Sequence, residues 1–85
     1  MRTQAEVRDQ LLTILSGLVE EAPKYTPGAD IFEDFGLDSL GQIELLFTIE
    51  QQFGVKIVDE TFESEGLRQF DQLVAHLVEH QRLAS

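Results

Sequence analysis

The stretch DSLGQIELLFTIEQQFG, which runs from Asp38 to Gly54, predicts the central helix of this chain. The carboxylate of Asp38 can cap the first turn of such a helix, and Gly54 is typical of the residue that ends one. We therefore expect a helix from Ser39 to Phe53.

The apolar side chains of this expected helix fall into two stripes, since successive residues are about 100° apart around its axis. The stripe expected in the core is Leu45, Leu46, Ile49 and Phe53. The second stripe, roughly 140° away, is Leu40, Ile43 and Phe47, flanked by Glu44 and Glu50. Apolar residues rimmed by charge are typical of a protein-docking surface. The alternative is that the second stripe widens the core beneath the preceding loop.

A first helix is expected upstream, from about Gln4 to Glu20. Thr3 and Glu6 have the spacing of a capping box, and Pro23 ends any continuation. The apolar residues at helical spacing are Val7, Leu11, Ile14, Leu15 and Leu18. Residues 21–38 lose this periodicity and form a long loop. We expect the loop to pack onto the helices through its apolar residues, which are Ile31, Phe32, Phe35 and Leu37.

Downstream of Gly54 the expected elements are shorter. Residues 55–58 alternate briefly, and we interpret them as an extended connector because a single strand has no partner. A short helical turn is expected at Thr61–Glu65, followed by a last helix from about Asp71 to Gln81. The chain is therefore predicted to be all-α, a four-helix bundle with three longer helices, one short helix and a long first loop.

Length and composition predict one domain that spans residues 1–85. The chain has 42% hydrophobic residues and no cysteine, so packed apolar side chains must stabilise it. Its formal net charge of −10 argues against nucleic acid and anionic membranes as partners and favours basic protein surfaces. The first residues lack the apolar core of a signal peptide, and no apolar run reaches membrane-spanning length. We expect a cytoplasmic monomer.

Ser39 is the candidate functional residue because it stands in the first turn of the expected helix 39–53. Backbone amides there lack intrahelical partners and the helix dipole is positive, so a phosphate on the Ser39 hydroxyl would be favoured. A hydroxyl at this boundary is also accessible to an enzyme. An Asp-Ser pair at a helix start is nevertheless common capping chemistry, so these features alone do not establish modification.

The segment Phe35-Gly36-Leu37-Asp38-Ser39-Leu40 resembles the signature of the acyl carrier protein family, in which the serine receives phosphopantetheine from coenzyme A. The likeness extends through residues 43–45 and 49–57 and includes the loop segment 30–34. It implies that Ser39 bears phosphopantetheine as a phosphodiester and that Asp38 assists the modifying transferase. The recognition surface that it implies consists of Leu40, Ile43, Glu44 and Phe47, with Glu50 beside it.

By this resemblance, the protein is an acyl carrier protein that holds thioester intermediates and presents them to enzymes without being an enzyme itself. The implied partners are a phosphopantetheinyl transferase and loading or synthase enzymes with basic docking surfaces. Residues 36–40 are closer to carriers of fatty-acid or polyketide synthesis. One alternative is a free-standing aminoacyl or peptidyl carrier. Another is an acidic helical adaptor that docks through the second stripe without a covalent arm.

Some positions depart from the family pattern. Gly41 stands where a polar or acidic residue is usual and lowers helix propensity by up to about 1 kcal/mol relative to alanine. Gln42 is neutral as well. Gln69 is a poor cap for the last helix, and we expect Asp71 to serve instead. These differences bear on the partner enzymes rather than on Ser39.

Residues 76–80, which read His-Leu-Val-Glu-His, match the pattern H-x-x-E-H of one class of zinc protease. A chain of this length leaves little scaffold for a substrate cleft, and we expect His76 and His80 to be solvent-facing. A serine hydrolase with Ser39 as nucleophile is not favoured, because the pattern G-x-S-x-G is absent. We therefore predict no catalytic residue and no metal site.

Overall fold

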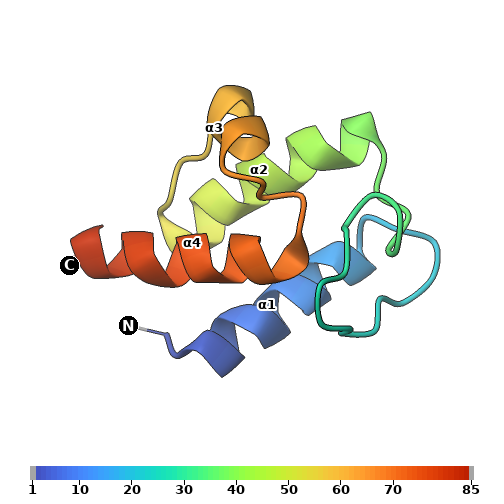
Figure 1. The fold of residues 1–85 in the computed structure, drawn as a ribbon, viewed down its shortest axis with the longest axis horizontal. Coiled ribbons are helices and arrows are strands. Elements are labelled where there is room, and N and C mark those ends of the chain that lie inside the picture. The colour runs from blue at the N-terminus through green and yellow to red at the C-terminus, as the bar shows by residue number, and fades with distance from the viewer. Residues whose placement is uncertain (1, 85) are drawn as a thin grey trace.

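The computed structural model describes residues 2–84, and the side chains of residues 2–81. The four helices are α1 (Gln4–Ser16), α2 (Ser39–Phe53), α3 (Asp59–Ser64) and α4 (Phe70–Ala84). The three longer helices enclose a common core, and the short α3 lies over one side of it (Figure 1). Within the described residues the only β-type pairing is an isolated bridge between Asp30 and Gln69. The prediction of an all-α bundle is confirmed.

Helix α1 begins as the sequence predicts and ends earlier. Thr3 Oγ1 accepts a hydrogen bond from the Glu6 amide (3.2 Å), and Glu6 Oε1 accepts one from the Thr3 amide (2.9 Å). The expected continuation to Glu20 is wrong, because the helix ends at Ser16 and Gly17 is its C-cap. The amide of Gly17 donates to the carbonyl of Ile14 (3.1 Å). Such a bond, one residue shorter than an α-helical one, tightens the last turn and closes the helix.

Helix α2 has the predicted bounds. Asp38 is its N-cap, and Gly54 ends it in the left-handed conformation at φ 70°, which glycine adopts without steric cost. Residues 55–58 form the expected extended connector, with Val55 and Ile57 buried.

The two later helices both begin before their predicted positions. Helix α3 begins at Asp59 rather than Thr61, and the acidic residues in its first turn suit the positive end of the helix dipole. Helix α4 begins at Phe70 and runs three residues beyond Gln81. The carbonyl of Gln69 accepts the first helical bond, from the Leu73 amide (3.0 Å).

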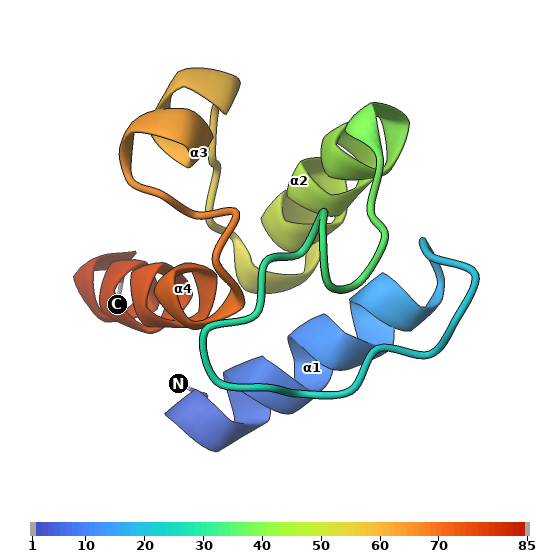
Figure 2. The ribbon, with the colours of Figure 1, turned by 45° about the vertical axis from the view of Figure 1, so that its right-hand side comes forward.

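Asp71 ties the long loop to α4, so its expected role as the cap of that helix is wrong. The Tyr25 hydroxyl donates to Asp71 Oδ1 (2.9 Å), and the amide of Gly28 donates to Asp71 Oδ2 (2.9 Å). The Tyr25 ring also packs against Phe70, with centroids 5.7 Å apart. The loop therefore passes close to the beginning of α4 on its way to α2 (Figure 2).

One core joins the helices and the loop. The residues with fully buried side chains include Phe62, Phe70, Leu11, Leu15, Ile31, Leu45, Ile49, Leu67, Leu73, Leu77 and Val7. They come from all four helices, from the long loop and from the α3–α4 connection. The prediction that the loop packs onto the helices is therefore confirmed. No helix within residues 2–84 is long and apolar enough to cross a membrane.

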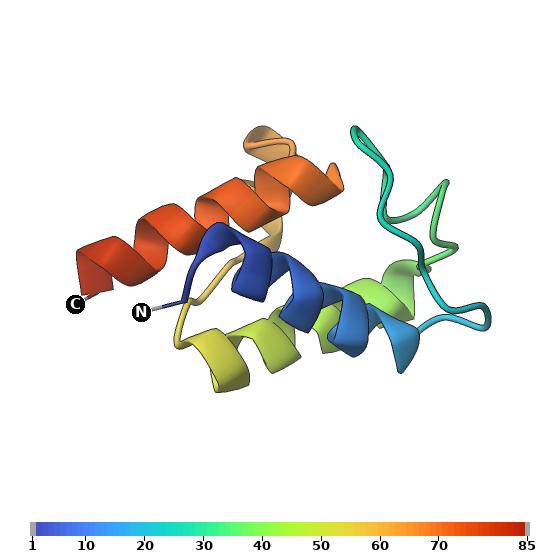
Figure 3. The ribbon, with the colours of Figure 1, turned by 90° about the horizontal axis from the view of Figure 1, so that it is seen from below.

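Arg2 joins three parts of the chain at one end of the bundle. Its guanidinium donates to the carbonyl of Gln52 (3.2 Å) and lies over the ring of Phe53, 4.8 Å from the centroid. The carbonyl of Arg2 accepts a hydrogen bond from the side chain of Gln81. The beginning of the chain therefore lies beside the ends of α2 and α4, as Figure 3 shows from below.

Candidate functional site

Ser39 is the first residue of α2 and is exposed. The carboxylate of Asp38, the preceding residue, accepts a hydrogen bond from the Gly41 amide (2.7 Å), and its carbonyl accepts one from the Gln42 amide (2.9 Å). These bonds fix the first turn. The Ser39 and Leu40 amides precede the first intrahelical bond and lie at the positive end of the helix dipole. An anion attached to the Ser39 hydroxyl fits this environment.

The loop immediately before Ser39 is a compact turn. Gly36 has a φ of 79°, in the region that favours glycine, and its amide donates to the Phe32 carbonyl (3.0 Å). The amide of Leu37 donates to the Ile31 carbonyl (3.0 Å), and the Leu37 side chain is buried. A buried residue thus stands two positions before the exposed serine, which fixes the direction from which the chain enters α2.

Gly41 allows Leu37 to reach the core beside the first turn of α2. A Cβ atom at position 41 would lie 2.6 Å from Leu37 Cδ1 and 3.1 Å from Asp38 Oδ1, closer than such atoms normally approach. Gly41 is also buried. The sequence shows this glycine only as a loss of helix propensity, whereas the structure shows that the missing side chain makes room for Leu37.

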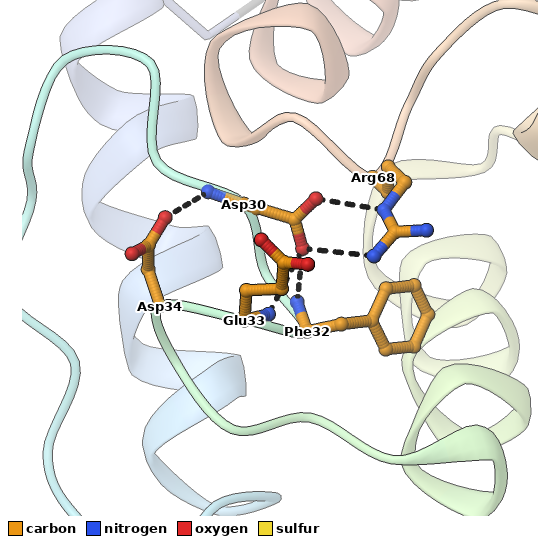
Figure 4. Close-up of polar contacts among 5 residues, drawn as sticks. All are labelled: Asp30, Phe32, Glu33, Asp34 and Arg68. Atoms are coloured by element: carbon orange, nitrogen blue, oxygen red, sulfur yellow. Dashed lines mark hydrogen bonds and ion pairs between the residues drawn. The ribbon is translucent and has the colours of Figure 1, made fainter.

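A tether centred on Asp30 holds the loop in place (Figure 4). Asp30 Oδ2 accepts from Arg68 Nε (2.7 Å), and Asp30 Oδ1 accepts from the amides of Phe32 (2.8 Å) and Glu33 (3.0 Å). The Asp30 amide donates to Asp34 Oδ2 (2.7 Å). The Arg68 guanidinium also lies over the ring of Phe32, 4.9 Å from its centroid. One carboxylate therefore connects the loop to the α3–α4 connection.

Backbone bonds reinforce the tether. The Ile31 amide donates to the Arg68 carbonyl (2.8 Å), and the Phe70 amide donates to the Ala29 carbonyl (2.8 Å). Burial of Asp30 acts to raise the pKa of its carboxyl, but the hydrogen bonds from Arg68 and the two loop amides outweigh burial and lower that pKa. No local sequence pattern predicts this tether. The available signal was that Arg68 is the only lysine or arginine between Lys56 and Arg82, in an acidic part of the chain.

The second apolar stripe of α2 is open to solvent. Leu40, Ile43 and Phe47 are 65%, 62% and 62% exposed, and the flanking Glu44 and Glu50 are exposed as well. The first stripe is buried, as expected; it consists of Leu45, Leu46, Ile49 and Phe53. The alternative in which the second stripe widens the core is therefore wrong. The stripe, with its two acidic flanks, is a continuous feature of the helix that begins at Ser39.

An open groove of about 880 Å³ lies on the loop side of the site. Gly36 and Asp38 line it next to Ser39. Its acidic residues are Glu20, Glu21, Glu33, Asp34 and Asp38, against the single base Lys24. Negative charge therefore borders the serine from the loop side, and this charge extends the attraction for basic surfaces.

The prediction that the two histidines of α4 face solvent is wrong. His76 and His80 are both half-buried, and their rings stack with centroids 3.8 Å apart. Burial lowers the pKa of His76, and the neighbouring His80 lowers it further. Within the described residues, no three histidine, cysteine or acidic side chains gather to hold a metal ion, and Ser39 has no hydrogen bond to a histidine. The arrangement offers no base for a serine nucleophile.

Known proteins are similar to this chain over most of its length. Residues 9–77 match the family model described as "Phosphopantetheine attachment site". Over 78 residues the chain is 32% identical to "Acyl carrier protein 2, mitochondrial" of Arabidopsis thaliana. The aligned part covers 91% of this chain and 60% of that relative. The matched range contains the whole of α2, the tether between Asp30 and Arg68 and the residues around Ser39.

Proposed function

We propose that this chain, which belongs to the phosphopantetheine attachment site family, carries its prosthetic group on Ser39. Members of this family bind phosphopantetheine covalently, so the question for this chain is which atom holds it. Ser39 is an exposed hydroxyl at the amino end of α2, inside the matched region and next to free helix amides. This position is the observation that carries the proposal.

The residues around Ser39 have complementary tasks in this proposal. Asp38 fixes the first turn of α2, and the buried Leu37 fixes the approach of the loop, so the serine hydroxyl is held outward. Asp38 is also the acidic group closest in sequence that can assist the modifying transferase. The phosphopantetheine supplies a thiol that holds a cargo as a thioester. The chain itself catalyses no reaction, in keeping with a family of carriers rather than enzymes.

The open stripe of α2 is the proposed docking surface for partner enzymes. Its exposed apolar residues offer contact area, and Glu44 and Glu50 offer charge to a basic partner. The net charge of −10 raises encounter rates with such partners while each contact stays weak. The proposed partners are a phosphopantetheinyl transferase and the enzymes that load or use the cargo.

We propose an acyl cargo of the fatty-acid or polyketide type. The relative named above is an acyl carrier protein by its printed name, and the segment 36–40 resembles acyl carriers more than peptidyl carriers. An aminoacyl or peptidyl cargo is the second candidate. A single carrier domain over residues 1–85, a monomeric state and a cytoplasmic location complete the proposal, although the name of the relative assigns that protein to mitochondria.

Intact mass measurement tests the attachment. The chain is incubated with coenzyme A, Mg²⁺ and a broad-specificity phosphopantetheinyl transferase. The wild-type chain should gain one phosphopantetheine, and Ser39→Ala should gain none. Ser64→Ala, which removes another exposed hydroxyl, is the matched control and should be modified like the wild type. A wild-type chain that gains no mass would instead support the non-covalent adaptor, and modification of Ser39→Ala would move the attachment elsewhere.

A further inference from the structure

The middle of α4 carries two imidazoles that the proposed function does not use. His76 and His80 are four residues apart, so they project from the same face of the helix. Their rings lie against each other, with centroids 3.8 Å apart and planes inclined by 28°. From there α4 runs on toward the C-terminus, away from the beginning of α2 (Figure 1).

One of the two rings, that of His80, makes a hydrogen bond to the helix backbone, whereas the His76 ring makes none within residues 2–81. His80 Nδ1 lies 2.9 Å from the carbonyl oxygen of His76. Because a carbonyl only accepts, Nδ1 of the neutral His80 ring carries the proton and Nε2 carries a lone pair. Metal-bound histidines are oriented in this way, by a hydrogen bond from the nitrogen that does not bind the metal. Rotation of the His76 ring toward a shared ion therefore breaks no hydrogen bond among residues 2–81, although it separates the two stacked rings.

The surroundings of the pair are open and acidic. The histidines border a groove of about 350 Å³, and its walls include Glu65 from the α3–α4 connection and Glu79 from α4. These carboxylates attract a cation to the groove. Since the described residues contain no cluster of three such ligands, the protein would supply two nitrogens and water would complete the coordination.

We propose that His76 and His80 form a two-imidazole binding site for a divalent transition-metal ion of the Zn²⁺ type. Imidazole suits zinc, nickel and copper, whereas Mg²⁺ and Ca²⁺ prefer oxygen ligands. The second nitrogen binds intramolecularly once the first is bound, which makes the pair a chelate. An ion at this site links consecutive turns of α4 and stabilises the helix without contact with Ser39. The site has no catalytic task.

Calorimetric titration of the full chain, prepared without added histidines, with Zn²⁺ tests the proposal. The measurement is made at slightly alkaline pH, where imidazole is unprotonated. The wild-type chain should bind one ion, and its Tm should rise with zinc concentration because the ion binds the folded state. His76→Gln and His80→Gln should each weaken binding by about tenfold or more, since each removes the chelate. Glu79→Gln, a charge change in the same groove, is the matched control and should weaken binding much less.

Two results would overturn the proposal: a wild-type chain that binds no zinc, or a histidine variant that binds zinc as the wild type does. The second result would assign the ion to carboxylates. If a variant shows reduced helicity by circular dichroism, the imidazole ¹⁵N resonances of the wild-type chain decide the matter. Zinc must shift the resonances of both rings, and a shift of only one ring or of neither overturns the two-imidazole site. Attachment at Ser39 is measured separately, so failure here leaves the proposed function unaffected.

Discussion

The chain on the two sides of Ser39 is built in opposite ways. Upstream, the loop is held by buried side chains and by the hydrogen bonds of the Asp30 carboxylate. Downstream, α2 leaves a stripe of large apolar side chains open to solvent. The loop is therefore built to hold the serine in one place, and the α2 face is left available for contact. The loop before Ser39 contributes to stability, and the exposed face of α2 after it is available for recognition.

The largest expected effect on stability is the difference between two phenylalanines on opposite sides of Ser39 in the sequence, Phe35 and Phe47. Phe35 is buried and packs edge-on against Phe70, with centroids 5.7 Å apart, whereas Phe47 is 62% exposed. Phe35→Ala should lower the free energy of unfolding by about 3 kcal/mol or more. Phe47→Ala should change it by no more than about 0.5 kcal/mol. Urea unfolding of the two variants makes the comparison, and equal losses would contradict the division described above.

Neutralising Asp30 should give a smaller, pH-dependent loss. Asp30→Asn keeps an acceptor for the loop amides but removes the charge that pairs with Arg68, so we expect a loss of about 1 kcal/mol at neutral pH. The folded state lowers the pKa of Asp30, so its contribution is complete above the ordinary carboxyl pKa of about 4. It is lost as the pH falls through the lowered pKa.

Urea unfolding as a function of pH checks this prediction. The stabilities of the wild-type chain and Asp30→Asn should differ at pH 7 and converge below about pH 4. Arg68→Gln is the control, because removal of the partner charge should give the same pattern of convergence. A difference between wild type and Asp30→Asn that persists unchanged into acid would show that the charge of Asp30 is not the source of its contribution.

A still smaller effect is expected at Gly41. Gly41→Ala gains helix propensity but forces Leu37 away from the first turn, and we expect a net loss of about 0.5–1 kcal/mol. Gly17→Ala is the matched change at a position with φ −87° and no contact closer than 3.5 Å, and it should be neutral or stabilising. The Tm of each variant, measured by thermal unfolding, tests this prediction. If Gly41→Ala raises the Tm as much as Gly17→Ala does, Leu37 moves aside without loss of stability.

The smallest effect on stability is expected on the open face. Glu44→Lys should leave unfolding nearly unchanged, because Glu44 is exposed and its side chain has no hydrogen-bond partner among the described residues. At low salt it should slow modification by the transferase several-fold, and added salt should reduce the difference. Glu63→Lys on α3 makes the same charge change away from α2 and is the control. Equal slowing by both variants would indicate a general charge effect.

The sequence predicted best what depends on neighbours along one helix. The bounds of α2, the Thr3–Glu6 capping box and the division of its apolar residues into two stripes follow from local spacing, and the structure confirms them. Local spacing did not decide whether the second stripe is exposed or buried; the structure shows that it is exposed. The candidate site came from the same local patterns, because Ser39 is defined by its place at the start of α2.

The sequence could not predict what depends on residues far apart. Arg68 and Asp30 are separated by 38 positions, and Asp71 and Tyr25 by 46, so no local pattern connects them. Local spacing therefore favours Asp71 as the cap of α4, whereas in the structure its carboxylate accepts hydrogen bonds from Tyr25 and Gly28 of the loop. The end of α1 at Ser16 was missed for a related reason. Leu18 continues the apolar spacing of α1 and packs against the core from a turn rather than from a helix.

The contacts of Arg2 with Gln52 and Gln81 have a practical consequence for work with this protein. They place Arg2 and Gln81 at the end of the bundle where α2 finishes, and the 15 residues of α2 separate that end from Ser39 by roughly 20 Å. A fluorophore, surface linker or fused partner attached at either terminus therefore leaves the serine and the open α2 face unobstructed. The protein can be immobilised through this end of the bundle while Ser39 and the open face of α2 stay accessible to solution.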